Sequence, residues 1–546
     1  MISYLYEVFT EALNKIGIEN KDALYFEEPK NIQFGDFSTN IAMKLAKELK
    51  KSPVAIANEI INNLDFSPEK IESVNIAGAG FINIKLTEKF WTDNLKIVLV
   101  QKEDFGKSFI GKGKRANVEY VSVNPTGLLH IGHGRNAVIG DTVANLLEWT
   151  GYDVTREYYF NNAGNQMKVL ADSIYARYIQ LFIDESFPFP EDGYHGDYVK
   201  EIAKDLHKVY GNSLKEGTYQ DLTQIRKFGE NWCFEKIKAT LERLNIKQNM
   251  FFNEDSLYKG GKINEVIEFF KSKDLAYEKD GALWLALSKM GLNDDRVIVK
   301  STGEPTYRLP DIAYHRDKFE RGFDLIVDLF GADHIATYPD VLAALKSMGY
   351  DTNKVKVLIH QFVTLTENGE QVKMSKRTGK SYTLDDLIDE VGADVVRFFL
   401  LMRSINTHLE FDLSLAKEQS EKNPVFYLQY AHARICSIIE KIKNENVEID
   451  DNADLSVLTT QTEQNLIKQI LKLPDIVIQA ASKYEPYILA EYLKDVASSF
   501  HVFYHECRII GSAVEIASAR YALCIATRYV LANGLKILGV SAPEKM

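Results

Sequence analysis

Two histidines, His130 and His133, stand three residues apart just after a strand-like run and an Asn-Pro-Thr-Gly turn. At this spacing on a helix, both imidazoles can point to one place and donate hydrogen bonds to phosphate oxygens. The helix start also favours anions, and Gly127 and Gly132 allow the backbone to approach closely. The pattern indicates a polyphosphate site, with a helix cap that carries two surface histidines as the alternative.

A second polar segment lies much further along the chain. It gathers Lys373, Lys376, Arg377 and Lys380 beside Ser375. A flexible basic loop of this kind can close on a polyphosphate and neutralise the charge that develops on a leaving group. The alternative is a solvated basic turn.

The two segments read HIGH at residues 130–133 and KMSK at residues 373–376. In this order the pair resembles the signatures of the class I aminoacyl-tRNA synthetases. The one departure is Arg377, where that family often has serine, and a basic residue there keeps the charge of the loop. The resemblance implies catalytic roles for His130, His133, Lys373 and Lys376. It implies ATP-binding roles for Gly127, His130, Gly132, His133, Lys373, Met374, Ser375 and Lys376.

Four further residues are candidates for binding an amino-acid side chain. Glu119 and Asn124 flank the end of the strand before HIGH, and Tyr307 and Asp311 lie in another segment of the middle region. A guanidinium is planar, permanently charged and rich in donors, so it requires carboxylates in a fixed geometry. Ordinary ion pairs are the alternative for both acids. VEYVSVNPTGLLHIGHGR and the Tyr-x-x-x-Asp spacing resemble arginyl-tRNA synthetase, which implies that all four residues bind arginine.

This resemblance implies ATP-dependent attachment of L-arginine to tRNA(Arg) through an arginyl-adenylate. The partners implied are therefore tRNA(Arg), L-arginine and ATP, with Mg²⁺ bound through the ATP phosphates and no metal held by the protein alone. Gly331 and His334, at a strand end of the same sheet, are expected to contact adenosine or arginine, and a structural histidine is the alternative. The family generally binds tRNA before it activates arginine.

Surfaces for tRNA are expected at both ends of the chain. Lys44 and Lys47 lie on one face of an N-terminal helix, which a solvated helix face would also explain. The resemblance places anticodon contacts on the helix that opens the C-terminal region, although core packing of its two tyrosines is the alternative. The residues expected to make these contacts are Tyr427, Tyr430, His432 and Arg434.

The elements that must position these residues fall into three regions. Residues 106–400 alternate strand and helix signals, which predicts a Rossmann-type parallel sheet with an insertion at about 185–295. Residues 1–105 predict a small α+β domain that contacts the body of the tRNA, and FGDFSTNIAMKLAK there resembles the extra domain of arginyl enzymes. Residues 401–546 predict a helical anticodon-binding bundle without strands. The fold class is thus multidomain α/β plus α.

The net charge, the apolar runs and the cysteines disfavour several classes of protein. The net charge of −12 disfavours a general DNA-coating role, and no apolar run is long enough to span a membrane. The four cysteines are widely separated, as is typical of proteins in a reducing cytoplasm. The family default is a monomer.

Several rival functions are disfavoured by particular residues. A cysteinyl enzyme would gather cysteine and histidine ligands around zinc, which the scattered cysteines do not do. Glutamyl and glutaminyl enzymes need a cation facing the side chain, which Glu119 and Asp311 would repel. A catalytically silent tRNA-binding paralogue would lose phosphate-binding residues, but both motifs are intact. A small nucleotidyltransferase with a HIGH motif would lack the C-terminal bundle.

Overall fold

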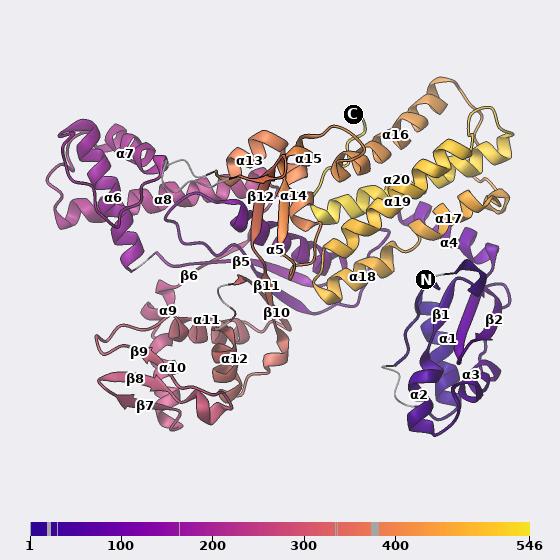
Figure 1. The fold of residues 1–546 in the computed structure, drawn as a ribbon, viewed down its shortest axis with the longest axis horizontal. Coiled ribbons are helices and arrows are strands. Elements are labelled where there is room, and N and C mark those ends of the chain that lie inside the picture. The colour runs from indigo at the N-terminus through magenta and orange to yellow at the C-terminus, as the bar shows by residue number, and fades with distance from the viewer. Residues whose placement is uncertain are drawn as a thin grey trace.

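The computed structural model describes residues 2–18, 23–29, 31–162, 164–332, 335, 337–372 and 382–546. A parallel sheet lies at the centre of the molecule, and two lobes project from it on one side (Figure 1). The C-terminal helices and the N-terminal domain lie on the other side. Within the described residues, no helix combines the length and the apolar character that crossing a membrane requires.

The central sheet has five parallel strands in the order β11-β10-β4-β5-β6. The predicted parallel-sheet fold is therefore confirmed. The non-sequential order puts the carboxyl ends of β4 and β10 side by side, which is where ligands bind in such sheets. The strands are β4 (Arg115–Glu119), β5 (Asp153–Phe160), β6 (Met250–Asn253), β10 (Leu325–Gly331) and β11 (Val355–His360).

The strand before the HIGH motif ends earlier than the apolar run Val118–Val123 suggests. β4 ends at Glu119, because Val121 and Ser122 adopt positive φ values of 69° and 45°. A β-branched residue in this conformation is a rare and strained feature. It turns the chain sharply out of the sheet and leads it to helix α5 (Ile131–Trp149), which begins with the motif.

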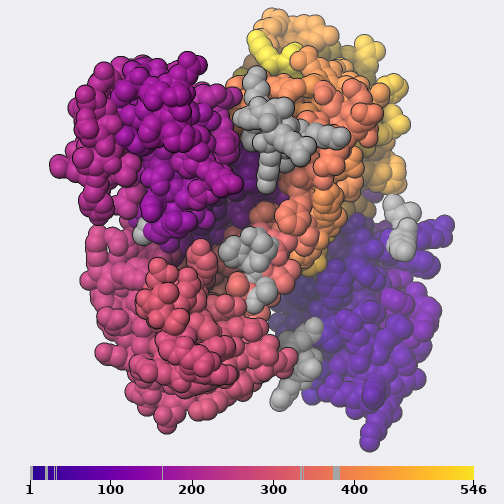
Figure 2. Space-filling view, turned by 60° about the vertical axis from the view of Figure 1, so that its left-hand side comes forward, coloured from indigo at the N-terminus to yellow at the C-terminus, as the bar shows by residue number. Residues whose placement is uncertain are grey.

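Two long excursions leave the sheet on either side of β6. The first is helical, and the second packs helices on a three-stranded antiparallel sheet of order β7-β8-β9. Figure 2 shows the two lobes one above the other. The range expected to be a single insertion, about 185–295, thus covers most of the first excursion, the sheet strand β6 and more than half of the second excursion. The elements of the two excursions are α6 (Asn165–Phe182), α7 (Asp197–Tyr210), α8 (Tyr219–Arg243), α9 (Asp255–Lys259), α10 (Lys262–Ser272), β7 (Ala276–Lys279), β8 (Ala282–Leu285), β9 (Arg296–Val299) and α11 (Arg308–Glu320). Helix α12 (Tyr338–Ser347) lies between β10 and β11 and packs against α11.

The N-terminal region is an α+β unit whose antiparallel sheet has the order β1-β3-β2. Lys468 and Lys472 of the C-terminal region pair with Asp36 and Glu28 of this unit, at 2.5 and 2.7 Å. The elements are α1 (Ile2–Lys15), β1 (Phe37–Thr39), α2 (Ile41–Leu49), α3 (Pro53–Asn62), β2 (Ile71–Ala77), β3 (Phe81–Leu86) and α4 (Glu88–Gln101).

The C-terminal region is a helical bundle, as expected, with one exception. The expectation of no strand is wrong for β14 (Leu409–Asp412), which pairs in parallel with β12 (Val363–Glu367). At four residues the strand is too short to show an alternation in the sequence. The remaining elements are β13 (Glu370–Gln371), α13 (Leu384–Val391), α14 (Ala393–Leu401), α15 (Leu413–Lys417), α16 (Pro424–Asn444), α17 (Gln461–Ile470), α18 (Leu473–Lys483), α19 (Tyr487–Glu506) and α20 (Val514–Leu538).

Candidate active site

The two histidines of the HIGH motif form the first turn of α5. His130 is the N-cap, and its Nδ1 accepts the backbone N–H groups of Gly132 at 3.1 Å and His133 at 3.4 Å. Nδ1 of His133 accepts the N–H of His130 at 3.4 Å, and the two rings stack with centroids 3.5 Å apart. Since both Nδ1 atoms are acceptors, the proton of each neutral ring sits on Nε2 and is available to a ligand.

Both rings are neutral near pH 7. Burial lowers the pKa of His130, and burial together with the charges of His130 and His360 lowers the pKa of His133 to about 3. A neutral imidazole can donate one hydrogen bond to a phosphate oxygen without bringing a formal charge. The start of α5 therefore offers two side-chain donors, together with the positive end of the helix dipole.

Two glycines at this turn pack closely against neighbouring side chains. A Cβ on Gly132 would lie 3.0 Å from the ring of His130, and a Cβ on Gly134 would lie 2.8 Å from Leu384. Leu384 begins α13, and its N–H donates to the carbonyl of Leu129 at 2.8 Å. The segment that follows the KMSK motif is thus docked on the segment that precedes HIGH. The predicted residues Lys373, Met374, Ser375, Lys376 and His334 lie outside the described residues.

A cavity of about 460 Å³ opens at the carboxyl ends of β4, β5, β6 and β10, and Asn136 of α5 lines it. The structure brings together in its lining all four residues expected to bind arginine, which are Glu119, Asn124, Tyr307 and Asp311. Asn124 Oδ1 accepts the N–H of Asn161 at 3.1 Å, whereas the Tyr307 side chain is 80% exposed at the rim. Gly331, at the end of β10, also lines the cavity. Gly127 packs near Tyr198, since a Cβ added at Gly127 would lie 3.2 Å from the tyrosine hydroxyl.

The cavity contains a third carboxylate, Glu254, that the sequence did not reveal. It follows β6 directly and accepts hydrogen bonds from the hydroxyl of Tyr159 and, at 2.9 Å, from Asn161. β6 lies inside the range interpreted as an insertion, so the sequence pattern predicts no ligand-binding residue at its carboxyl end. The signal was present, since Glu254 comes directly after a strand of the same parallel sheet, where ligands bind.

A buried ion cluster supports the floor of the cavity. Lys318 is fully buried, and its Nζ donates to Glu119 at 2.6 Å and to Asp328 at 2.5 Å. His315 Nε2 lies 3.0 Å from the other oxygen of Asp328. Although burial favours the neutral form of His315, the charge and hydrogen bond of Asp328 raise the pKa of this residue. The cluster fixes the carboxylate of Glu119 in place, where Ser122 Oγ also donates to it at 2.9 Å.

Burial changes the acidity of the remaining carboxyl groups. It raises the pKa of Asp311 to about 7, and the negative charges of Glu119 and Glu254 contribute to this shift. Burial also raises the pKa of Glu254. A nearby positive charge stabilises the ionised form of a buried carboxyl group. A cationic ligand in the cavity would therefore be bound strongly by Asp311 and Glu254.

The residues expected to contact tRNA are placed unevenly. Lys44 and Lys47 are exposed on α2, and Lys44 Nζ donates to the carbonyl of Ala23 at 3.2 Å. On the bundle, Arg434 lies over the rings of Tyr430 and Tyr504, at 4.8 and 4.6 Å from their centroids.

Two more residues of this helix differ in exposure. Tyr427 is partly exposed and packs against His501, with centroids 4.8 Å apart. His432 instead is 5% exposed, and its Nδ1 donates to the carbonyl of Pro543 at 2.9 Å. His432 therefore fixes the C-terminal segment and does not face the surface that carries Arg434.

Comparison with known proteins matches three family models to parts of this chain. Residues 94–397 match the family described as tRNA synthetases class I (R), catalytic domain. Residues 3–86 match the arginyl tRNA synthetase N terminal domain, and residues 428–546 match the DALR anticodon binding domain. A curated arginine–tRNA ligase from Salinibacter ruber is 49% identical, over the whole of both chains. The chain belongs to the arginyl-tRNA synthetase family.

Solved structures of arginyl-tRNA synthetases share this fold. A putative arginyl-tRNA synthetase from Campylobacter jejuni is 34% identical, with a TM-score of 0.78 over 84% of this chain and 100% of that one. The arginyl-tRNA synthetase of Thermus thermophilus is 22% identical, with a TM-score of 0.81 over the full length of both chains. The family predicted from the HIGH and KMSK motifs and from the Glu119 and Asp311 segments is thereby confirmed.

Proposed function

We propose that the cavity binds L-arginine and that the first turn of α5 binds the ATP phosphates. The chain is an arginine–tRNA ligase of class I, which attaches arginine to tRNA(Arg) through an adenylate. The observation that carries the substrate assignment is the convergence of Glu119, Glu254 and Asp311 on one cavity, which Asn136 of α5 also lines. Arginine brings a guanidinium and an α-ammonium, and three carboxylates are matched to this pair of cations.

The reaction has two steps. An oxygen of the arginine carboxylate attacks the α-phosphorus of ATP, the bond to pyrophosphate breaks, and arginyl-adenylate forms. A terminal ribose hydroxyl of tRNA(Arg) then attacks the acyl carbon, and AMP leaves. Neither step needs a protein nucleophile, so rate acceleration comes from positioning and from stabilising charge. The Nε2–H groups of His130 and His133 supply donors to the phosphates in the first step.

The second motif completes the ATP site in this proposal. The resemblance assigns Lys373 and Lys376, with Met374 and Ser375, to the phosphates that leave, and Gly331 and His334 to adenosine or arginine. Mg²⁺ would be held by the ATP phosphates. The reason is that Mg²⁺ usually binds through substrate phosphates and water rather than in a cage made by the protein alone.

The outer domains are proposed to bind the tRNA. Residues 1–105 would contact its body through Lys44 and Lys47, and residues 401–546 would contact the anticodon. Support for the second surface comes from the stacked arrangement of Tyr430, Arg434 and Tyr504, because rings and guanidinium planes can stack on unpaired bases. Tyr427 belongs to the same surface, and His432 would act on it only by fixing the chain end.

The cellular setting is proposed to be the cytoplasm, with the chain acting as a monomer. All four cysteines are free, and such cysteines are typical of proteins in a reducing compartment. The monomer rests on the resemblance, and light scattering of the purified chain would test it.

Exchange of pyrophosphate into ATP tests the activation step. The assay is run with arginine, lysine, glutamate, cysteine and citrulline, each with and without tRNA(Arg). We expect exchange with arginine, dependent on tRNA. Citrulline has nearly the shape of arginine but no charge, so its failure would show that the carboxylates select a cation. Absence of exchange with arginine under all conditions would contradict the substrate assignment.

A further inference from the structure

A buried arginine follows the HIGH motif on α5 and binds only main-chain carbonyls in its described hydrogen bonds. Arg135 is fully buried. Its Nη1 donates to the carbonyls of Gln361 at 2.7 Å and Phe362 at 3.4 Å. Its Nη2 donates to the carbonyls of Ser404 at 3.1 Å and Thr407 at 2.9 Å. One planar group thus joins the start of α5 to two segments that are distant in sequence.

The two segments are the entries to one small sheet. Residues 361–362 connect β11 to β12, and residues 404–407 lead from α14 to β14. They also bond to each other, since the N–H of Gln361 donates to the carbonyl of Ile405 at 3.1 Å. β12 pairs with β14 and forms a hairpin with β13, after which the sequence continues to the KMSK residues. Arg135 therefore connects the phosphate-binding turn to the sheet that precedes the second motif.

The C-terminal bundle holds the same loop from another side. Glu485 lies between α18 and α19, and its two carboxylate oxygens accept Ser404 Oγ at 2.7 Å and the N–H of Ile405 at 3.2 Å. The loop 404–407 is thus held by two groups: the guanidinium of Arg135 donates to its carbonyls, and the carboxylate of Glu485 accepts from its hydroxyl and N–H donors. Burial lowers the pKa of Arg135 to about 10, and the charge of Glu485 opposes this shift.

The geometry of Arg135 is specific to a guanidinium. One terminal nitrogen of Arg135 reaches the carbonyls of residues 361–362 and the other reaches those of residues 404 and 407, which requires a planar, branched donor. A lysine ammonium would act as a point charge and could not reproduce this geometry. Arg135 lies two residues beyond His133, so a tilt of its helix turn would displace both imidazoles. A displacement of about 1 Å in such a site can reduce the rate about 100-fold.

We infer that Arg135 is a positioning residue of the activation step, which sets the HIGH imidazoles against the β12–β14 sheet through loop 404–407. Glu485 supports this arrangement from the C-terminal bundle. The inference rests on the proposed function, because it concerns the placement of ATP relative to arginine. Arg135 itself is expected to touch neither substrate.

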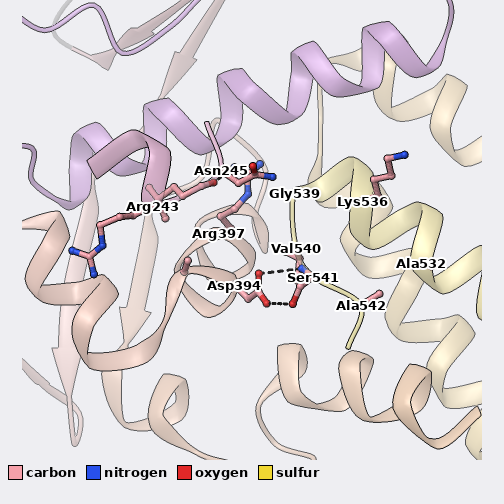
Figure 3. Close-up of a pocket in the computed structure, with 12 residues that line it drawn as sticks. Arg243, Asn245, Asp394, Arg397, Ala532, Lys536, Gly539, Val540, Ser541 and Ala542 are labelled. Atoms are coloured by element: carbon pink, nitrogen blue, oxygen red, sulfur yellow. Dashed lines mark hydrogen bonds between the residues drawn. The ribbon is translucent and has the colours of Figure 1, made fainter. Parts of the chain in front are cut away.

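A second buried arginine provides a matched control. Arg397 is 1% exposed and also binds two carbonyls, those of Leu538 at 3.0 Å and Leu244 at 2.6 Å, but it additionally pairs with Asp141 at 2.7 Å. Figure 3 shows it beside Gly539, at the junction between the catalytic region and the last helix of the bundle. Of these partners only Asp141 lies on α5, eight residues beyond His133, whereas Leu244 follows α8 and Leu538 ends α20.

The test compares Arg135→Lys, Glu485→Gln and their double variant with Arg397→Lys and Glu463→Gln. Glu463 is a buried carboxylate of the same bundle that pairs with Arg520 at 2.7 Å, away from loop 404–407. Pyrophosphate exchange is measured in the presence of tRNA, with separate KM values for ATP and arginine and a melting temperature for each variant. Exchange by the native chain tests the proposed function independently, and only the ratio of variant to native tests the inference.

We expect Arg135→Lys to lower kcat about 100-fold and to raise the KM for ATP, with no change in the KM for arginine. Glu485→Gln should give the same pattern more weakly, and the double variant should be non-additive because both act through one loop. The control variants should lower the melting temperature but should not combine a lower kcat and a higher KM for ATP with an unchanged KM for arginine. Equal kcat and KM in native and Arg135→Lys, or the same split in Arg397→Lys, would overturn the inference. If Arg135→Lys does not fold, an unchanged kcat and KM for ATP in Glu485→Gln would overturn it.

Discussion

The amino-acid cavity and the first turn of α5 differ in the charge of the side chains that they offer to a ligand. The amino-acid cavity presents carboxylates, and a fully buried lysine holds one of them, Glu119, in place. The first turn of α5 presents neutral imidazoles, because burial lowers the pKa of both His130 and His133. These two ends lie at the same edge of one sheet, so the fold alone does not set their electrostatics. The difference follows from the side chains that each strand end supplies.

The two solutions fit two kinds of ligand. A guanidinium keeps its charge throughout the reaction, so carboxylates fixed in advance can select it. The charge on ATP changes as pyrophosphate leaves, and hydrogen-bond donors already in place stabilise that change without reorganisation. Fixed charge requires a supporting network such as Lys318 and Asp328, whereas neutral donors need only a helix start and close packing.

Lys318→Met should have the largest effect, because it removes the shared partner of Glu119 and Asp328. Glu119 would keep the Ser122 hydroxyl and Asp328 would keep His315, but both would lose the buried ammonium, and breaking a buried pair typically costs about 3–5 kcal/mol. We expect a fall of that size in the free energy of unfolding, measured by urea denaturation at pH 7.5. Lys417→Met, which removes a surface lysine between Glu367 and Glu390, is the control and should change stability little. Equal losses in both variants would show that the cavity has no special electrostatic support.

His133→Ala should have the next largest effect and should act on the other end of the site. Loss of one preorganised donor typically reduces kcat about 100- to 1,000-fold. We expect such a fall in pyrophosphate exchange, with the KM for arginine unchanged, and partial recovery in His133→Asn through its amide donor. Since the pKa of His133 is about 3, its ionisation should leave no step in the rate near pH 6.5. A step there that disappears in His133→Asn would contradict the neutral-donor assignment.

The contrast between the two ends also explains what the sequence could predict. His130 and His133 lie three residues apart and form one helix turn, so a local pattern was enough to find them. Glu119 and Asp311 were found through resemblance, and the structure brings them to one cavity. Glu254 was missed, because β6 is four residues long and lies far from the other strands in the sequence. The role of Lys318 depends on contacts with Glu119 and Asp328 across three elements, and no local pattern encodes such contacts.

The same reasoning applies to the fold. The alternation of strands and helices predicted the parallel sheet, since each βαβ unit is a local pattern. The end of β4 could not be predicted, because Val121 and Ser122 adopt positive φ values that their residue types disfavour. Val121 is held there by its N–H bond to Asn136 Oδ1 at 2.6 Å, a contact with α5 that exists only in the folded chain.

Glu254→Gln tests the third carboxylate of the cavity. The variant keeps the size of the side chain and removes one charge, so it tests whether the third carboxylate faces the substrate cation. Hydrogen bonds to charged groups contribute about 1.5–3 kcal/mol, which corresponds to a rise of roughly 10- to 150-fold in the KM for arginine. Glu265→Gln, on an exposed carboxylate that pairs with Arg316, is the control and should leave this KM unchanged. A change in the KM for ATP but not for arginine would place Glu254 outside the arginine site.

The smallest effect concerns pH and Asp311, whose pKa burial raises to about 7. Below that pH the free enzyme carries a protonated Asp311, and a guanidinium must displace the proton to bind. Above it the carboxylate is already ionised.

The KM for arginine should therefore rise as pH falls below 7, by at most about tenfold per pH unit for one proton, and should be flat above pH 8. The KM for ATP should not follow this curve, since the imidazoles at the other end stay neutral over the range. Asp311→Asn should remove the dependence while raising the KM at every pH, and a slope that persists in that variant would assign the titration to another group of the cavity, such as Glu254.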